Sequence, residues 1–306
     1  MLRALFIWLS ESRSLRGFAE RSSAGQRMSQ RFVAGTQVDD ALRATKAVND
    51  LGASVSIDNL GENVTSSEEA KQSAALYHQL LDLISERKLN ANVSVKLTHM
   101  GLDMDEKLAY DNVTSLVQHA ATLGSFVRVD MEGSPYTQRT LDFVHRLHRD
   151  PANDDAVGAV IQSYMRRSQS DVKTLLAERI RIRLCKGAYK EPPEVAFQKK
   201  SEVDASYVRL MKILLQSGTY HGIATHDENI IRQTIAFARS ESIPPASFEF
   251  QMLHGIRRDL QQGLVKDGWR MRVYIPFGTE WYPYLMRRLA ERPANVLFIA
   301  KNILRG

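Results

Sequence analysis

Two adjacent arginines near the end of the chain, Arg287 and Arg288, are of a residue type that binds anions. If Tyr284, Arg287, Arg288 and Glu291 lie on one helix, spacings of three, four and seven residues from Tyr284 stack them along one side. A planar guanidinium suits a carboxylate or phosphate, and each charge-assisted hydrogen bond contributes about 1.5–3 kcal/mol. The simpler interpretation is that both arginines pair with Glu280, Glu291 or solvent.

Other residues that could do chemistry lie within or just after short apolar segments. They are Asp58, Glu62, Lys96, His99, Asp130, Glu132, Gln162, Tyr164, Arg183, Lys186, Thr225, His226, Gln251, His254 and Tyr274. Three of them, Lys96, Arg183 and Lys186, are cationic and predict an anion site together with the two arginines. A buried lysine beside other cations can also serve as a nucleophilic amine, so a Schiff-base lyase using Lys96 is an alternative.

Several kinds of chemistry have little support in the sequence. No metal site is expected: His226 has only the adjacent Asp227, His99 and His254 are isolated, and no H-E-x-x-H helix or cysteine cluster occurs. The single cysteine, Cys185, excludes an internal disulfide, favours a reducing compartment and is expected to be a buried small side chain. No G-x-S-x-G turn indicates a serine nucleophile. A redox reaction would require a bound cofactor.

The segments that carry these residues alternate with helical patterns. Eight β-branched or apolar runs occur in order: "ASVSIDNLGE", "VSVKLTHMG", "FVRVDMEGS", "GAVIQSYMRR", "RIRLCKGAY", "HGIATHDE", "FEFQMLHG" and "MRVYIPFG". Ser66 and Glu69 predict a capping box that opens a helix after the first run, and Gly218 is expected to end the helix over 201–217. This rhythm predicts a (β/α)8 barrel, whose site lies at the C-terminal ends of the strands.

The whole chain is expected to form one domain. Residues 1–50 would be an N-terminal helical segment packed on the barrel, and residues 51–306 the catalytic barrel. A doubly wound sheet is the alternative, but no G-x-G-x-x-G fingerprint is present. The apolar run from Ala4 to Leu9 is far shorter than the roughly 20 residues that span a membrane. An amphipathic N-terminal helix packed on the body is the simplest expectation, with peripheral membrane contact as an alternative.

The net charge of +6 is compatible with anionic ligands, lipid head groups or nucleic acid. Because the basic residues are scattered and no nucleic-acid motif is present, a nucleic-acid binder is not expected. On chemistry alone, a cofactor-dependent oxidoreductase, a lyase and a non-enzymatic anion binder remain open.

As a set, the motifs "NLGE", "VSVKL", "RVDMEG", "IQSY", "IRLCKGAY", "ATHDE", "FEFQMLHG" and "RVYIPFGTEWYPYLMRRLAERP" resemble proline dehydrogenase of the small, monofunctional bacterial type. The resemblance runs from about Phe32 to the end of the chain. It implies a distorted (β/α)8 barrel that holds FAD without a covalent bond at its C-terminal mouth.

The resemblance also implies roles for individual residues. Arg287 and Arg288 look like the pair that grips the carboxylate of proline, and Glu62 looks like a gate that pairs with Arg287. The substrate pocket would be completed by Lys96, Leu253, Tyr274 and Tyr284, with Tyr274 favouring proline over hydroxyproline. Asp130 resembles the active-site aspartate and Arg183 the arginine beside flavin N5. The remaining expected cofactor-binding residues are Met131, Gln162, Lys186, Gly187, Ala188, Thr225, His226 and Gln251.

The reaction implied by the resemblance is oxidation of L-proline to 1-pyrroline-5-carboxylate, with hydride transfer from proline C5 to FAD N5. Electrons would then pass to a membrane quinone, which implies a cytoplasmic protein at the inner face of the membrane. A separate pyrroline-5-carboxylate dehydrogenase would consume the product, because 306 residues leave no room for a second catalytic domain.

Overall fold

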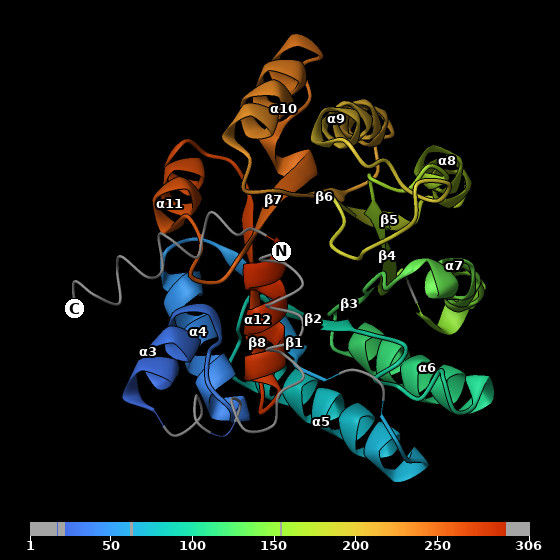
Figure 1. Cartoon of the computed structure of the whole chain (residues 1–306), viewed down its shortest axis with the longest axis vertical. Helices are drawn as coiled ribbons and strands as arrows, with labels where there is room; N and C mark the ends of the chain where they lie inside the picture. The colour runs from blue at the N-terminus through green and yellow to red at the C-terminus, as the bar shows by residue number, and fades with distance from the viewer. Residues whose placement is uncertain (1–16, 18–21, 62–63, 154, 292–306) are drawn as a thin grey trace.

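A computed structural model describes residues 17, 22–61, 64–153 and 155–291, without the side chains of 23–24, 26–28 and 287–291. Within this part of the chain, eight parallel strands close into a barrel in sequence order (Figure 1). The strands are β1 (Ser54–Asn59), β2 (Ala91–Val95), β3 (Val127–Val129), β4 (Val157–Gln162), β5 (Arg181–Cys185), β6 (His221–Ala224), β7 (Phe248–Leu253) and β8 (Met271–Phe277). Each overlaps one of the eight predicted segments, with β2 and β4 beginning one or two residues earlier, so the predicted (β/α)8 barrel is confirmed.

Helices follow every strand. They are α5 (Ser67–Glu86), α6 (Glu106–Thr122), α7 (Ser134–Arg149), α8 (Ser168–Ala177), α9 (Lys200–Gln216), α10 (Glu228–Ser240), α11 (Arg258–Lys266) and α12 (Trp281–Glu291). Two further helices, α3 (Ser23–Phe32) and α4 (Val38–Asp50), precede β1. Parallel neighbouring strands require such crossovers, and most of these helices cover the outside of the barrel.

The helix boundaries follow local signals in part. Ser66 accepts a hydrogen bond from the Glu69 backbone N–H at 3.2 Å, as predicted, and so begins α5. The carboxylate of Glu69, however, accepts from the backbone N–H of Thr65 at 2.7 Å, one residue before the expected partner. The predicted capping box is therefore only half formed. Helix α9 ends just before Gly218, which adopts φ +74°.

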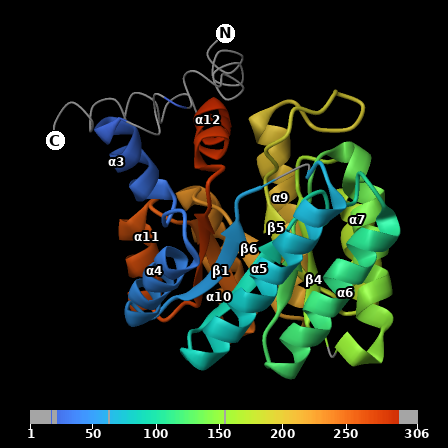
Figure 2. The same ribbon diagram turned by 90° about the horizontal axis from the view of Figure 1, so that it is seen from below.

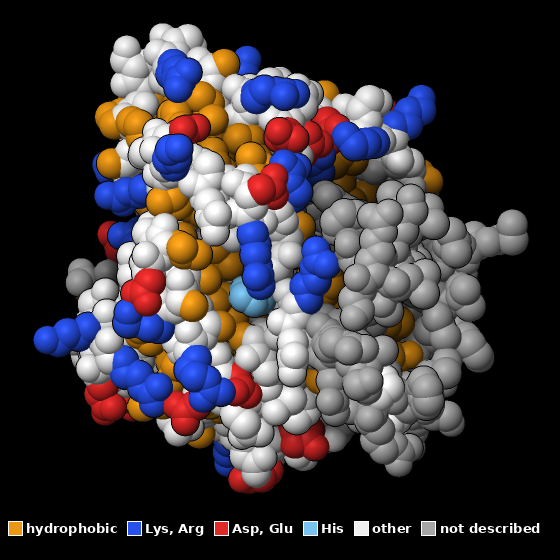
Figure 3. Space-filling view, turned by 90° about the vertical axis from the view of Figure 1, so that its left-hand side faces the viewer, with side chains coloured by type: hydrophobic (Ala, Val, Ile, Leu, Met, Phe, Trp, Pro, Cys, Tyr) orange, Lys and Arg blue, Asp and Glu red, His pale blue; other side chains and the backbone are white. Residues whose placement is uncertain are grey.

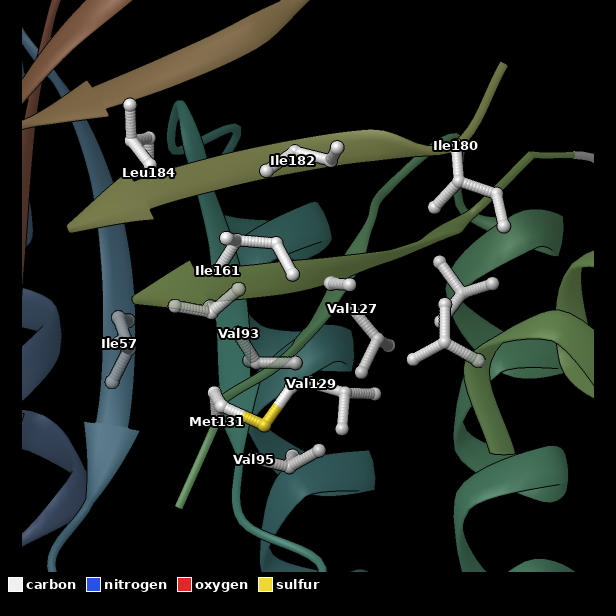
Figure 4. Close-up of a cluster of buried hydrophobic side chains, with 14 of the residues drawn as sticks. Ile57, Val93, Val95, Val127, Val129, Met131, Ile161, Ile180, Ile182 and Leu184 are labelled. Atoms are coloured by element: carbon white, nitrogen blue, oxygen red, sulfur yellow. The ribbon is translucent and has the colours of Figure 1, made fainter. Parts of the chain in front are cut away.

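Side chains alternate between two environments along each strand. Outward positions are apolar and form the layer between sheet and helices, part of which Figure 4 draws: Ile57, Val93, Val95, Val127, Val129, Ile161, Ile182 and Leu184. The residues between them, such as Ser56, Ser94 and Arg183, hydrogen-bond to one another across the barrel interior. Because successive side chains in a strand point to opposite faces, one period-two pattern fills both the apolar layer and a polar interior.

The helix that follows the last strand does not take the usual place beside it. Helix α4 contacts both β1 and β8 and covers the seam between the first and last strands. Helix α12 instead contacts α3, and the two stand together at one end of the barrel (Figure 2). The chain thus uses a helix from before the barrel to cover its side, which leaves the last helix at the mouth.

Basic side chains do not gather into one patch on the face that Figure 3 draws, where acidic side chains lie between them. Among the described residues, no helix is both long enough and apolar enough to cross a membrane.

The buried histidine His221 makes stability depend on pH. Its Nδ1 accepts from the Ile182 backbone N–H at 3.0 Å, so the ring proton lies on Nε2, 2.9 Å from Ser217 Oγ. Burial, and secondarily the charge of Arg128, lowers the pKa of His221 from 6.5 to about 3. Between these values the unfolded chain binds a proton that the folded protein does not, so stability falls as pH drops below 6.5.

We expect the free energy of unfolding of His221→Gln to depend less on pH than that of the unaltered protein. The difference in slope should be up to about 1.4 kcal/mol per pH unit between pH 6.5 and 5. Urea unfolding of both proteins at pH 7 and pH 5 measures the difference. The control His119→Gln changes a partly exposed ring at the surface. Equal pH dependence in His221→Gln and the unaltered protein would contradict the prediction.

Candidate active site

A cavity of about 1110 Å³ opens at the C-terminal end of the barrel. Its lining includes the strand ends, the segments that follow β5, β6 and β7, and parts of α3 and α12. This volume slightly exceeds the roughly 300–1,000 Å³ of typical ligand pockets. The cavity could therefore hold a large ligand and a small one together.

Arg183 occupies the floor of the cavity and is held by four side chains. Its Nε donates to Gln251 Oε1 at 2.6 Å and its Nη1 to Asp130 Oδ1 at 2.7 Å. Its Nη2 donates to the hydroxyls of Ser56 and Ser94, each at 3.1 Å. These contacts use four of the five N–H groups of a guanidinium. No described residue accepts from the fifth, on Nη1, so it remains available to a ligand.

Asp130 joins Arg183 to Tyr274. Its Oδ2 accepts from the Tyr274 hydroxyl at 2.8 Å, while Oδ1 accepts from Arg183. The guanidinium carbon of Arg183 also lies 5.1 Å from the centre of the Tyr274 ring. Burial raises the pKa of Tyr274 well above its usual value, and the neighbouring Asp130 raises it further. Tyr274 therefore keeps its proton and acts as a donor to Asp130.

Lys96, just after β2, forms an ion pair with Asp58 of β1. The Lys96 ammonium lies 3.1 and 3.2 Å from the two carboxylate oxygens, and the Asp58 side chain is almost fully buried. The hydroxyl of Tyr77 contacts the same carboxylate at 3.4 Å. An ion-paired ammonium has no free electron pair on nitrogen, so this geometry counts against the Schiff-base lyase.

Lys186 follows β5 and is oriented by two carboxylates. Its ammonium donates to Asp204 at 2.6 Å and to Asp227 at 2.8 Å. Burial would raise the pKa of Asp227, but the hydrogen bond and charge of Lys186 outweigh it and hold that pKa at about 2. No described residue takes the third N–H of Lys186, which lies on the cavity lining.

The backbone after β5 approaches the cavity closely at Gly187. This residue adopts φ +108°, and a Cβ there would lie 2.2 Å from the ring of Tyr164. Only glycine fits this conformation and this contact.

His226 links the segments that follow β6 and β7. Its Nε2 accepts from the Leu253 backbone N–H at 2.9 Å.

The lining suits a large cofactor that carries a planar ring system and phosphates. Apolar groups such as Val160, Ala224 and Leu253 can border a planar ring system, and the free N–H groups of Arg183 and Lys186 can meet its polar edge and its phosphates. No Rossmann fingerprint is needed, because the contacts come from strand ends and their loops.

All the residues to which the family resemblance gives a role, and whose side chains the structure describes, line this single cavity. They are Lys96, Asp130, Met131, Gln162, Arg183, Lys186, Gly187, Ala188, Thr225, His226, Gln251, Leu253, Tyr274 and Tyr284. Glu62 lies outside the described residues. Arg287 and Arg288 fall within α12, but their side chains are not among those described.

Some strand-end candidates have structural roles instead. Glu132 is buried and accepts from the Thr98 backbone N–H and hydroxyl, at 3.2 and 2.7 Å. Tyr164 packs beneath Gly187 rather than lining the cavity. Cys185 was expected to be a buried small side chain, but it is only partly buried and contributes to the lining.

Several residues of the site were not predicted from the sequence. Ser56 and Ser94 lie within strands rather than at their ends, yet they bind Arg183. Phe32 of α3 and Tyr189 after β5 also line the cavity. The period-two pattern would have revealed the serines, because they occupy the same inward positions as Asp58 and Lys96.

Comparisons with known proteins agree with one another. The family model described as proline dehydrogenase matches residues 41–301. The chain is 40% identical over 306 residues to proline dehydrogenase 1 of Bacillus subtilis, covering 100% of both chains. It is 38% identical over 282 residues to the proline dehydrogenase of Deinococcus radiodurans, covering 91% of each.

A solved structure is also similar. Proline utilization A of Bdellovibrio bacteriovorus, inactivated by N-propargylglycine, matches with a TM-score of 0.81 and 27% identity. The match covers 87% of this chain but only 32% of that one, so this chain spans about a third of the larger protein.

Proposed function

This chain belongs to the proline dehydrogenase family, whose members are oxidoreductases that oxidise proline, and from that premise we propose that it uses FAD to oxidise L-proline to 1-pyrroline-5-carboxylate. The observation that carries the proposal is the network around Arg183, which fixes a cation with one free N–H at the floor of a large cavity. The full-length match to the Bacillus protein supports a monofunctional enzyme.

We assign the cofactor to the side of the cavity formed by β3 to β7. Arg183 would donate to the flavin, while Lys186, with Gly187 and Ala188 beside it, would hold the phosphates. Met131, Gln162, Thr225, His226 and Gln251 would complete the cofactor lining. When bound, FAD would supply hydride acceptance at N5, the chemistry that the side chains lack.

We assign proline to the side nearest α12. Arg287 and Arg288 would grip its carboxylate, with Lys96 close to it and Glu62 closing over the site. The proline ring would be bordered by the side chains of Leu253, Tyr274 and Tyr284. The inactivation of the Bdellovibrio protein by N-propargylglycine, an amino acid with a secondary amine, supports a substrate of the same chemical class.

The residues of the chain prepare the site for hydride transfer from proline C5. Arg183 places positive charge where reduction of the cofactor would develop negative charge. Asp130 sets Arg183 and Tyr274 relative to each other, because one carboxylate oxygen contacts each of them. Proline would bind as a carboxylate with a neutral amine, so that its nitrogen can assist the loss of hydride.

We further propose that electrons leave to a membrane quinone from a cytoplasmic enzyme at the inner face of the membrane. A separate pyrroline-5-carboxylate dehydrogenase would take the product. The division into an N-terminal helical segment, residues 1–50, and a catalytic barrel, residues 51–306, belongs to the same proposal. It is supported by the end of α4 at Asp50 and the start of β1 at Ser54.

The decisive experiment is a visible absorption spectrum before and after anaerobic addition of L-proline. A flavin spectrum that bleaches would support cofactor and substrate together. A flavin spectrum that does not bleach would direct attention to other secondary amines. A colourless protein that cannot take up FAD would overturn the proposal, and borohydride trapping on Lys96 would then test the lyase alternative.

Tyr274→Ser should change substrate preference. Removing the Tyr274 ring opens the space that the hydroxyl of hydroxyproline needs. One small substrate group that a pocket accepts or excludes changes the preference between two substrates by about 10- to 200-fold. We expect activity on proline to fall and the ratio of kcat/KM for hydroxyproline over proline to rise about tenfold. Tyr136→Ser, at a partly buried tyrosine of α7 outside the cavity lining, is the control. An unchanged ratio in Tyr274→Ser would contradict the proposal that the Tyr274 ring borders the substrate.

A further inference from the structure

Six side chains form a closed ring of hydrogen bonds inside the barrel, below the cavity. In order around the ring they are Arg183, Gln251, Glu249, Arg272, Asn92 and Ser56. They come from β5, β7, β8, β2 and β1, so the ring links strands on different sides of the barrel.

Each contact in the ring has a fixed direction. Gln251 Nε2 and Arg272 Nε both donate to Glu249 Oε1 at 2.6 Å. Arg272 Nη1 and Ser56 Oγ both donate to Asn92 Oδ1, at 2.8 and 2.6 Å. Because arginine can only donate and an ionised carboxylate can only accept, Glu249 determines which way the Gln251 amide faces. The amide oxygen is thereby turned toward Arg183 Nε.

Glu249 is well suited to this task. Its side chain is buried, and its second oxygen accepts from the Tyr220 hydroxyl at 2.9 Å. Burial would raise the pKa of Glu249, but the charge and hydrogen bond of Arg272, together with the hydrogen bonds from Gln251 and Tyr220, lower it below its usual value. Glu249 is therefore ionised at neutral pH, as the only anion of the ring.

A glycine on the neighbouring strand leaves room for the same amide. Gly222 of β6 pairs with Glu249 in the sheet, and a Cβ added there would lie 2.3 Å from Gln251 Nε2. An alanine would have to displace the end of the Gln251 side chain. Glu249 thus fixes the direction of the Gln251 amide, and the missing side chain at Gly222 leaves the space that the amide occupies.

We infer that Glu249 is a positioning residue, which acts through Gln251 to hold the Arg183 guanidinium so that its free N–H faces the cofactor. The inference rests on the proposed function of the cavity and deepens it. Glu249 itself does not line the cavity.

Two variants perturb the amide independently. Glu249→Met combined with Arg272→Met removes both charges, so that neither is left buried without its partner. Gly222→Ala leaves the charges in place and displaces the amide sterically. Tyr220→Phe is the control, since it removes a donor to Glu249 without touching Gln251.

The readout is the midpoint potential of the bound flavin, measured by equilibration with a reference dye. We expect both perturbing variants to bind reduced flavin about tenfold less tightly relative to oxidised flavin, a lowering of about 30 mV. Tyr220→Phe should stay within twofold. Thermal unfolding of the cofactor-free proteins separates general destabilisation from this effect.

An unchanged potential in Gly222→Ala with flavin bound would overturn the inference, and so would an equal shift in Tyr220→Phe. If the double variant does not fold, Gly222→Ala decides alone. An unaltered protein that binds no flavin would defeat the proposed function itself, which keeps the two failures distinguishable.

Discussion

Asp130→Ala is expected to lower kcat/KM for proline by about 10²- to 10³-fold, the range seen when one preorganised electrostatic contact is removed from an active site. The carboxylate serves two donors, Arg183 Nη1 at 2.7 Å and the Tyr274 hydroxyl at 2.8 Å. Without it, a buried cation loses its ion-pair partner and a hydroxyl loses its acceptor. Steady-state kinetics with an artificial electron acceptor, normalised to bound flavin, measures the change.

A second variant at the same position, Asp130→Asn, should not restore activity. An amide offers an acceptor to only one of the two donors and directs its own N–H groups at the other. Asp142→Ala, at an exposed carboxylate of α7, is the matched control and should remain near the unaltered protein. Activity of Asp130→Ala within threefold of the unaltered enzyme, at full flavin content, would show that Asp130 does not organise the site.

Arg288→Met should weaken binding of a non-oxidisable carboxylate analogue of proline by about 2–4 kcal/mol, or roughly 30-fold to nearly 1,000-fold. The reason is that a desolvated carboxylate loses a charged, hydrogen-bonding partner. The loss should appear in the dissociation constant of the analogue, titrated against the flavin spectrum.

Arg232→Met provides the control for Arg288→Met, because Arg232 is exposed on α10, outside the cavity lining. It should leave the dissociation constant unchanged. A change of less than threefold in Arg288→Met, with flavin still bound, would end the assignment of this arginine to the substrate carboxylate.

The fold could be predicted from the sequence because its signals are local. Each strand is a short apolar run followed by polar residues, and the alternation with helices leaves few topologies. The position of the last helix could not be predicted in this way. The local pattern of α12 is helical, but only tertiary contacts decide that α4 covers β1 and β8 while α12 contacts α3.

Charged or large polar residues were easier to identify from the sequence than small polar ones. Arg183 and Tyr274 are conspicuous because a charged or large polar side chain interrupts an apolar strand. Ser56 and Asn92 are small and common in many settings, so they become informative only when strand register brings them to Arg183 and Arg272. Ion-pair partners such as Asp204 and Asp227 around Lys186 lie far apart in sequence and follow from the fold alone.

The seam between β1 and β8 also governs when the site can form. The Ser54 hydroxyl of β1 donates to the Met271 carbonyl of β8 at 3.2 Å, across a sequence separation of 217 residues. During synthesis, most of the chain must therefore emerge before the first strand meets its second neighbour. Until then β1 and the most recent strand present open edges, which can pair with other chains. Assembly of the active site is thus a late, post-translational event, and interrupted synthesis would leave an aggregation-prone sheet instead of a partly active enzyme.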